Sequence, residues 1–382
     1  MKITGIRSAG LRHGTPQGGW SKEIQPEDCI HTLIAVFTDE GITGWGSAFT
    51  NDELAQAALH VLEPLFLGEN PLEPDRVNEK LQAHTFWLGR GGSITHAISG
   101  IDIAMWDILG KATNQPVGRL LGGRYRERVR PYASILMCEA HLLQEYLVEA
   151  RSQGFRAFKI GWGPFGRRHS FAEDEDLVRS ARDAVGPQSW LMVDAGASDA
   201  FWPEDYKWAA RTARMLADYD VYWFEEPLPP DDLYHYRLLR NSSPVPIASG
   251  EVLTRRQSFS PWLQQRALDI VQPDATKVGG ISEARRIAWM AEEAGVQFVP
   301  HGWNTALGLA ADLHLASAIR GTDLVEYLTG SPFIDDLVHA PWQLDSEGML
   351  PVPNGAGLGV SIDMDAVEKY TGQRFDSTAG SP

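Results

Sequence analysis

The sequence predicts an α/β protein: a (β/α)₈-type barrel that follows a smaller N-terminal α+β domain. The first reason is length, because 382 residues exceed one ordinary domain and fit a barrel plus a second unit. The second is the strict alternation of strand-like and helix-like runs after about residue 130. The third is the number of strand-like runs there, eight within about 200 residues, which is the number that closes a barrel.

The N-terminal part has the pattern of a small sheet followed by helices. Residues 1–48 alternate strand-like runs with turns and include a hairpin. Residues 12–20 are rich in Gly and Pro, so we expect a loop that either connects two strands or closes over a site. Residues 51–121 have helical patterns. The expected helices span residues 53–65, 75–88 and 94–113.

The barrel strands are expected to begin near residues 129, 157, 190, 221, 246, 269, 296 and 323. Helical patterns fill the gaps, for example at 173–185, 203–219, 282–294 and 306–319. The rival fold is a doubly wound open sheet. That fold usually places a Gly-rich phosphate-binding turn after its first strand, and none follows residues 132–135 here. The pattern therefore favours the barrel.

Composition limits which cellular compartment and which classes of partner we expect. The chain has 34 basic and 50 acidic residues and a net charge of −16, which argues against nucleic acid or an anionic membrane as a partner. An anionic substrate would need a local cation. Cys29 and Cys138 have no metal-binding or redox spacing, so we expect reduced thiols and a cytoplasmic protein. We expect no signal peptide and no membrane span.

Three short apolar runs each stop at an acidic residue: Asp194, Glu225 and Glu251. The acids are 31 and 26 positions apart, close to the roughly 30 residues of one β/α unit, so they should end successive strands at one barrel mouth. Three like charges there would raise each other's pKa, and a hard divalent cation such as Mg²⁺ relieves this. A single strand-end acid could equally cap the next helix. We choose Glu225 over Glu226 because Glu226 precedes Pro227 at the turn.

A second pair of residues predicts a general base. His301 follows Asp274 by 27 positions, so the two should sit on neighbouring strands. An aspartate beside a histidine fixes the tautomer of the ring and raises its basicity. Lys159 ends the second strand, where its charge could neutralise a substrate carboxylate, although it could also be a surface lysine.

Other polar residues have weaker support. Glu326 ends the last strand and could donate a hydrogen bond when protonated, anchor a hydroxyl or cap a helix. Lys277 could screen the acids or bridge a loop. For substrate contacts we expect the Gly/Pro-rich loop, the turn at 49–51 and two further segments, at 87–90 and 303–304. The named candidates are His13, Trp20, Arg90, Lys277 and Trp303.

Three stretches, at 97–111, 272–280 and 357–360, together with these acids, resemble the enolase superfamily in its mandelate racemase-like branch. The resemblance implies a modified (β/α)₇β TIM barrel over residues 126–344. It implies a capping domain over 1–125 that the C-terminal tail, 345–382, completes. It also implies Mg²⁺ on Asp194, Glu225 and Glu251, a dyad of His301 and Asp274, an electrophile at Glu326, and a homo-oligomer.

The departures from that family point to the reaction. Mandelate racemases carry a Lys-x-Lys pattern on the second barrel strand, and the second lysine is their other base. The similar stretch of this chain reads Lys159-Ile160-Gly161, with glycine at that position. Asp194 also lacks a histidine two residues later, unlike galactonate dehydratase-like members. A single base, His301, suits syn β-elimination. It would take the α-proton of an aldonate or aldarate and return it to the leaving 3-hydroxyl, giving a 2-keto-3-deoxy acid. The alternatives are a racemase or epimerase, and a non-catalytic binding protein on this fold.

Overall fold

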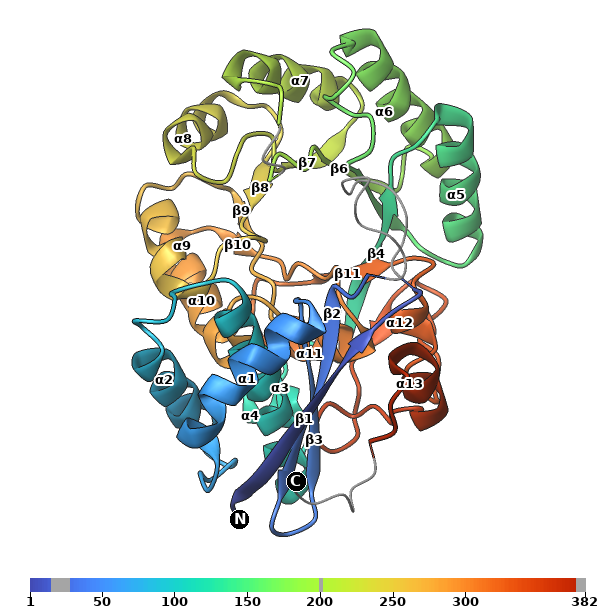
Figure 1. Ribbon diagram of the computed structural model, residues 1–382. Helices are drawn as coiled ribbons and strands as arrows, with labels where there is room; N and C mark the ends of the chain where they lie inside the picture. The colour runs from blue at the N-terminus through green and yellow to red at the C-terminus, as the bar shows by residue number, and fades with distance from the viewer. Residues whose placement is uncertain (15–27, 199–201, 376–382) are drawn as a thin grey trace.

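The computed structural model describes residues 1–14, 28–198 and 202–375. Figure 1 shows a ring of parallel strands surrounded by helices, and beside it a three-stranded sheet with its own helices. No helix in these ranges is both long enough and apolar enough to cross a membrane. The ring is the predicted barrel, and the smaller part covers one side of it.

Eight parallel strands form the barrel, and each begins within two residues of its predicted start. They are β4 (Arg128–Leu136), β5 (Ala157–Gly161), β6 (Trp190–Asp194), β7 (Val221–Glu225), β8 (Ile247–Ser249), β9 (Ile270–Val271), β10 (Gln297–Phe298) and β11 (Leu324–Leu328). The strands pair in chain order from β4 to β10, and β11 pairs with β4. A doubly wound sheet does not return its last strand to its first, so the predicted barrel is confirmed.

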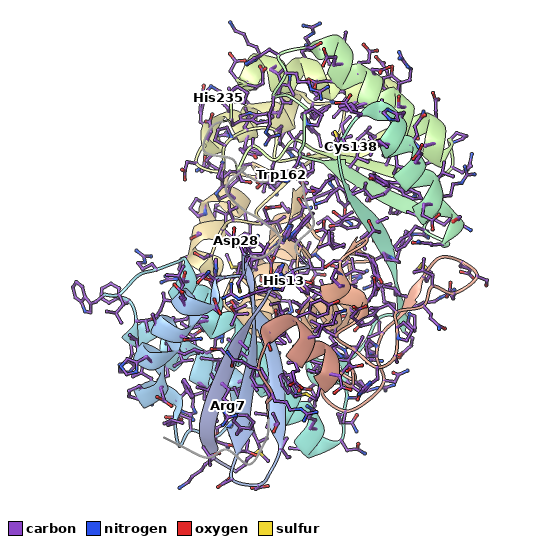
Figure 2. The ribbon with its side chains drawn as sticks, turned by 45° about the vertical axis from the view of Figure 1, so that its right-hand side comes forward. Arg7, His13, Asp28, Cys138, Trp162 and His235 are labelled. Carbon is purple, nitrogen blue, oxygen red and sulfur yellow. The ribbon has the colours of Figure 1, made fainter. Side chains whose placement is uncertain are left out.

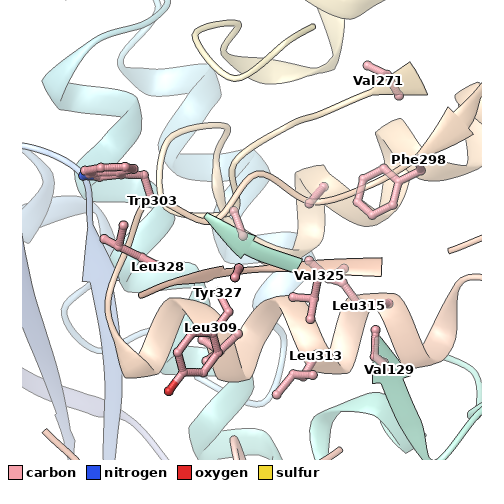
Figure 3. Packing of buried hydrophobic residues seen from close by; sticks show 14 of the residues in the cluster. Val129, Val271, Phe298, Trp303, Leu309, Leu313, Leu315, Val325, Tyr327 and Leu328 are labelled. Carbon is pink, nitrogen blue, oxygen red and sulfur yellow. The ribbon is translucent and has the colours of Figure 1, made fainter. Parts of the chain in front are cut away.

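Seven helices connect these strands, which gives the predicted (β/α)₇β order. They are α5 (Ala140–Ser152), α6 (Phe171–Val185), α7 (Tyr206–Asp218), α8 (Leu233–Ser242), α9 (Arg255–Gln264), α10 (Gly280–Ala294) and α11 (Ala306–Ala318). The strands are short and buried on both faces, as expected where a parallel sheet is covered by helices. One cluster of side chains, which includes Tyr132, Met192 and Trp223, fills the inside of the ring. Figure 3 shows the packing outside it, where Leu309 and Leu313 of α11 lie near Val325 and Tyr327 of β11.

The cap consists of an antiparallel sheet and the helices packed on it. The strands are β1 (Ile3–Leu11), β2 (His31–Thr38) and β3 (Thr43–Ala48). The helices are α1 (Asp52–Phe66), α2 (Pro74–His84), α3 (Ser93–Thr113) and α4 (Val117–Leu120). Close packing of β3 on α3 requires glycine, because a Cβ added at Gly46 would lie 2.0 Å from the Gly100 carbonyl oxygen. Helix α2 ends four residues before the predicted end at Leu88, and the turn that follows buries Thr85 but exposes residues 86–88.

The chain beyond the barrel returns to the cap. After α12 (Pro332–Asp335), strand β12 (Leu350–Pro351) pairs antiparallel with β4, and α13 (Met364–Thr371) packs on β1. The Arg12 N–H donates to the Tyr370 carbonyl oxygen at 2.9 Å. The Leu358 N–H donates to Asp107 Oδ1 of α3 at 2.9 Å. These contacts agree with a tail that completes the cap, while the division at residues 125 and 344 stays a prediction.

Candidate active site

The structure brings Asp194, Glu225 and Glu251 together at the carboxyl ends of the barrel strands. Asp194 is the last residue of β6 and pairs in register with Glu225, the last residue of β7. Glu251 follows β8 by two residues. One carboxylate oxygen of each lies within 4.8 Å of the others, and all three side chains are buried. In-phase parallel strands thus place the acids as their spacing predicted.

The contacts of these acids fit a bound divalent cation. Glu225 Oε2 accepts hydrogen bonds from Trp223 Nε1 and Gln272 Nε2, both at 2.8 Å, which fixes that carboxylate. Burial and the neighbouring Glu225 carboxylate raise the pKa of Asp194 well above its usual range. A cation of two charges would remove this repulsion. Three carboxylates with oxygen-only chemistry are the donors that Mg²⁺ prefers.

Glu226 adds a further buried acid at this end of the barrel. It has a left-handed backbone conformation, with φ of 43°, so it does not continue the strand after Glu225. Burial and the neighbouring Glu251 and Asp194 raise the pKa of Glu226 well above its usual value, although a hydrogen bond with Ser198 lowers it. A further buried carboxylate next to the triad is a further reason for a cation here.

Asp274 and His301 form the predicted pair. Their backbones make an isolated parallel bridge, and His301 Nδ1 lies 2.8 Å from Asp274 Oδ2. The other ring nitrogen, Nε2, faces the acids and lies 3.1 Å from Glu251 Oε2. Burial lowers the pKa of His301, but Glu251, Glu326 and Asp274 outweigh burial and leave it well above its usual value. The imidazole is therefore held at one nitrogen and presents the other to the site.

Lys159, on β5, contacts two acids of the triad and Glu326. Its Nζ is 2.6 Å from Glu225 Oε1, 3.0 Å from Glu326 Oε1 and 3.6 Å from Asp194 Oδ2. Burial lowers the pKa of Lys159, but Glu225 and Glu326 outweigh burial and leave it well above its usual value. The lysine is thus a buried cation at the acids and not the surface residue of the alternative interpretation.

Glu326 accepts hydrogen bonds from the Gly302 N–H at 2.8 Å and from the Tyr132 hydroxyl at 3.3 Å. Burial raises the pKa of Glu326, but Lys159 and His301 outweigh it and leave the pKa lowered. In this arrangement Glu326 is a hydrogen-bond acceptor. Its expected role as a protonated donor stays a prediction.

A pocket opens onto these groups at the carboxyl ends of the barrel strands. Its lining comprises Phe49, Ser134, Ile135, Leu136, Lys159, Gly161, Trp162, Asp194, Glu251, Lys277, His301 and Trp303. Lys277 and Trp303 are therefore where substrate contacts were expected. His13 and Arg90 are exposed and do not line the pocket, and Trp20 lies outside the described residues.

Lys277 meets both the acids and the cap. Its Nζ lies 3.8 Å from Asp274 Oδ2 and 4.0 Å from Glu251 Oε1, which fits the screening interpretation. The same ammonium sits 4.1 Å from the ring centre of Phe49, which belongs to the cap. The cap thus contributes one wall of the pocket and supports one of its cations.

Four lining residues were missed from the sequence: Ser134, Ile135, Leu136 and Trp162. Ser134 shares the inward face of β4 with Tyr132, so the alternation of that strand could have identified it. Trp162 follows β5 and has a left-handed backbone conformation, with a φ of 59°. No pattern in the sequence predicts that conformation. The labelled side chain of Trp162, like that of Cys138 after β4, can be followed in Figure 2.

Comparison with known proteins agrees with this geometry. Residues 142–366 match a family described as enolase C-terminal domain-like. Residues 27–122 match the mandelate racemase/muconate lactonizing enzyme N-terminal domain. The chain is 31% identical to a D-galactarolactone cycloisomerase of Agrobacterium fabrum, over 97% of this chain and 99% of that one. It is 32% identical to a D-xylonate dehydratase of Haloferax volcanii, over 88% of this chain and 84% of that one.

The solved structures give the same result. The crystal structure of the 3,6-anhydro-D-galactonate cycloisomerase from Zobellia galactanivorans superposes with a TM-score of 0.86 at 30% identity, covering 97% of this chain and 99% of that chain. The family matches, the relatives and the solved structures all indicate the same family. The chain belongs to the enolase superfamily, in its mandelate racemase/muconate lactonizing enzyme branch.

Proposed function

We propose that this enzyme is a Mg²⁺-dependent hydro-lyase of an acid sugar, an aldonate or an aldarate. The observation that carries the proposal is one oriented imidazole among the described residues that line the pocket. His301 Nε2 lies 3.1 Å from Glu251 of the triad, while the second lysine of the Lys-x-Lys pattern is replaced by Gly161. The relatives named dehydratases support the same reaction class.

The chemistry assigns a task to each group. Mg²⁺ held by Asp194, Glu225 and Glu251 would supply Lewis-acid charge to the substrate carboxylate. Glu251 would raise the pKa of His301 less when it holds the cation, so the neutral ring can take the α-proton through Nε2. Asp274 holds Nδ1–H and stabilises the imidazolium that forms. The electron pair left on the α-carbon forms the double bond as the C3–oxygen bond breaks. The imidazolium then protonates the leaving oxygen on the same face, so one base serves both steps.

Gly161 explains why a second base is missing. A Cβ added at Gly161 would lie 2.7 Å from the Asp194 Cβ, because β5 and β6 pair directly at these residues. A lysine there would displace a metal ligand in this backbone. Racemisation, which needs a base on each face, would have to use Lys159, and its ammonium is already engaged with Glu225 and Glu326.

The test is a screen of mono- and diacid sugars with Mg²⁺, with 2-keto acid formation as the readout. We expect turnover of at least one acid sugar, and we expect His301→Asn to lose about 10²–10⁴-fold in kcat while keeping its circular dichroism spectrum. Near-parental turnover by that variant would show that His301 is not the base.

A second candidate is a cycloisomerase, favoured by two relatives that each cover 97% of this chain. The same imidazole can drive elimination in which the leaving oxygen belongs to a lactone or anhydro ring, so the ring opens and no water leaves. Mass spectrometry separates the two reactions, because a hydro-lyase product is lighter than its substrate by one water and a ring-opened product is an isomer. Lactones and anhydro acids therefore belong in the same screen.

A further inference from the structure

The segment that joins the dyad to helix α10 is buried throughout. Every residue from 270 to 284 is buried, including the turn at 275–279. Connecting segments usually run over the surface, because buried backbone N–H and C=O groups need partners. This segment starts at Asp274, which holds His301. Its partners therefore bear on the position of the base.

Those partners come from the cap. The Gly279 N–H donates to Ser99 Oγ of α3 at 2.8 Å, and Asn78 Nδ2 of α2 donates to the Gly279 carbonyl oxygen at 2.6 Å. The Ser282 N–H donates to Asp102 Oδ2 at 2.9 Å, and the Ser282 hydroxyl donates to Asp102 Oδ1 at 2.7 Å. Two cap helices thus hold the start of a barrel helix.

Asp102 is the central acceptor of this contact. It is fully buried and also accepts from Asn78 Nδ2 at 2.8 Å. A Cβ added at Gly280 would lie 2.3 Å from Asp102 Oδ2, so the turn can rest on the carboxylate only because residue 280 is glycine with a positive φ of 90°. The fit of turn to carboxylate leaves little freedom for either.

The other end of the segment is tied to the dyad. Asp274 Oδ1 accepts from the Thr276 N–H and hydroxyl, both at 2.6 Å. The Val278 N–H donates to the Asp274 carbonyl oxygen at 2.8 Å. The Phe49 N–H of the cap donates to the Thr276 carbonyl oxygen at 3.3 Å. A shift of the turn would therefore move the Asp274 carboxylate.

We propose that Asp102 is a positioning residue for the Asp274–His301 dyad. From the cap it fixes the turn between Asp274 and α10, and through that turn it fixes the carboxylate that orients the imidazole. The cap is then part of the support of the base as well as a wall of the pocket. The inference rests on the proposed function in taking His301 as the base.

The test is Asp102→Asn, which keeps the shape and replaces one acceptor oxygen with an NH₂ group. That group would face the donors of Ser282 or Asn78, so at least one bond is lost. In ¹⁵N-histidine-labelled full-length protein, the Nδ1–H resonance of His301, assigned with His301→Asn, should shift or broaden. The kcat should fall about tenfold or more with KM little changed, as when a ligand-orienting hydrogen bond is removed.

Asp107→Asn is the matched control. Asp107 lies on the same helix, is also buried, and accepts backbone N–H groups of Leu358 and Trp45, which belong to the tail and the cap. It should lose stability without moving the His301 resonance. The proposal is overturned if Asp102→Asn keeps the parental resonance and kcat, or if both variants change them equally.

Two features keep the test decisive. If Asp102→Asn does not fold, Ser282→Ala is the second variant. It removes the hydroxyl that donates to Asp102 Oδ1 and accepts from Trp106 Nε1. It keeps the Ser282 N–H and should shift the same resonance less strongly. An unchanged resonance in that variant counts against the proposal. The resonance also needs no substrate, so a protein that turns over no acid sugar would refute the proposed function while leaving this measurement intact.

Discussion

The contacts of its two ring nitrogens orient His301. Asp274 holds Nδ1, and Nε2 lies near Glu251 and Glu326. The sequence predicted the pair from spacing alone, because neighbouring strands of a barrel bring residues about 27 positions apart to the same edge. It did not predict the bonds of Lys159 to Glu225 and Glu326, because those depend on side-chain direction inside the mouth.

Gly161 gives the first prediction. Gly161→Ala places a Cβ against Asp194, so either the ligand or the β5–β6 pairing must shift. We expect weaker Mg²⁺ binding by isothermal titration calorimetry and a loss of about 1–3 kcal/mol in the free energy of unfolding. Gly5→Ala is the control, since its added Cβ meets only Phe37, at 3.9 Å. Parental Mg²⁺ affinity in Gly161→Ala would refute the steric argument.

At the scale of elements, strands were easier to predict than helix ends. Several barrel strands are short apolar runs that stop at a polar residue, as β6, β7 and β8 do at Asp194, Glu225 and Ser249. Helix α2 was predicted too long because the apolar residues Phe86 to Leu88 continue its pattern, with no glycine before Gly89. The chain leaves the helix at Thr85 instead, and the Arg90 carbonyl oxygen then accepts from Thr254 Oγ1 at 3.4 Å. A long-range contact of this kind has no local signal.

Helix α7 gives the second prediction, because its first turn depends on one side chain. Asp205 Oδ1 accepts the N–H groups of Lys207 and Trp208 at 2.8 and 3.1 Å. Asp205→Ala should cost about 0.5–2 kcal/mol in urea unfolding. Glu139 precedes α5 without a side-chain cap bond, so Glu139→Ala should cost less. Equal losses would show that the cap bond contributes little.

At the scale of the whole molecule, the acid-rich mouth should couple metal binding to stability. Mg²⁺ that binds only the folded chain stabilises it by about 2.7 kcal/mol at a free concentration 100 times Kd. We therefore expect the Tm to rise with Mg²⁺, to fall with a chelator, and to lose this response in Asp194→Asn. A Tm that does not respond to millimolar Mg²⁺ would contradict the metal assignment. The cytoplasmic location and the homo-oligomer stay predictions.

A buried histidine between barrel and tail predicts a dependence on pH. His314 Nδ1 accepts from the Gly118 N–H, and Nε2 lies 3.1 Å from the Leu358 carbonyl oxygen. Burial lowers the pKa of His314 to about 3. Because the unfolded ring titrates near pH 6.5, its contribution is complete above that pH and is lost as pH falls from about 6.5 towards 3.

His314→Gln removes this titration. The slope of unfolding free energy against pH, measured with urea between about pH 4 and pH 6, should become shallower by about 1.4 kcal/mol per unit. His141→Gln, at an exposed position, should leave the slope unchanged. A slope in His314→Gln equal to that of the parent would mean that His314 is not held neutral by burial.

The sequence by itself determined the order of strands and helices, the three acids and the aspartate–histidine pair. It could do so because the barrel repeats one unit, so spacing along the chain becomes position around the mouth. The tertiary structure decided what spacing does not encode: which polar residues face inward, which candidates miss the pocket, and how the cap meets the barrel. Asp102 and Ser282 are 180 positions apart, and only the docking of the cap on the barrel puts that carboxylate on that turn.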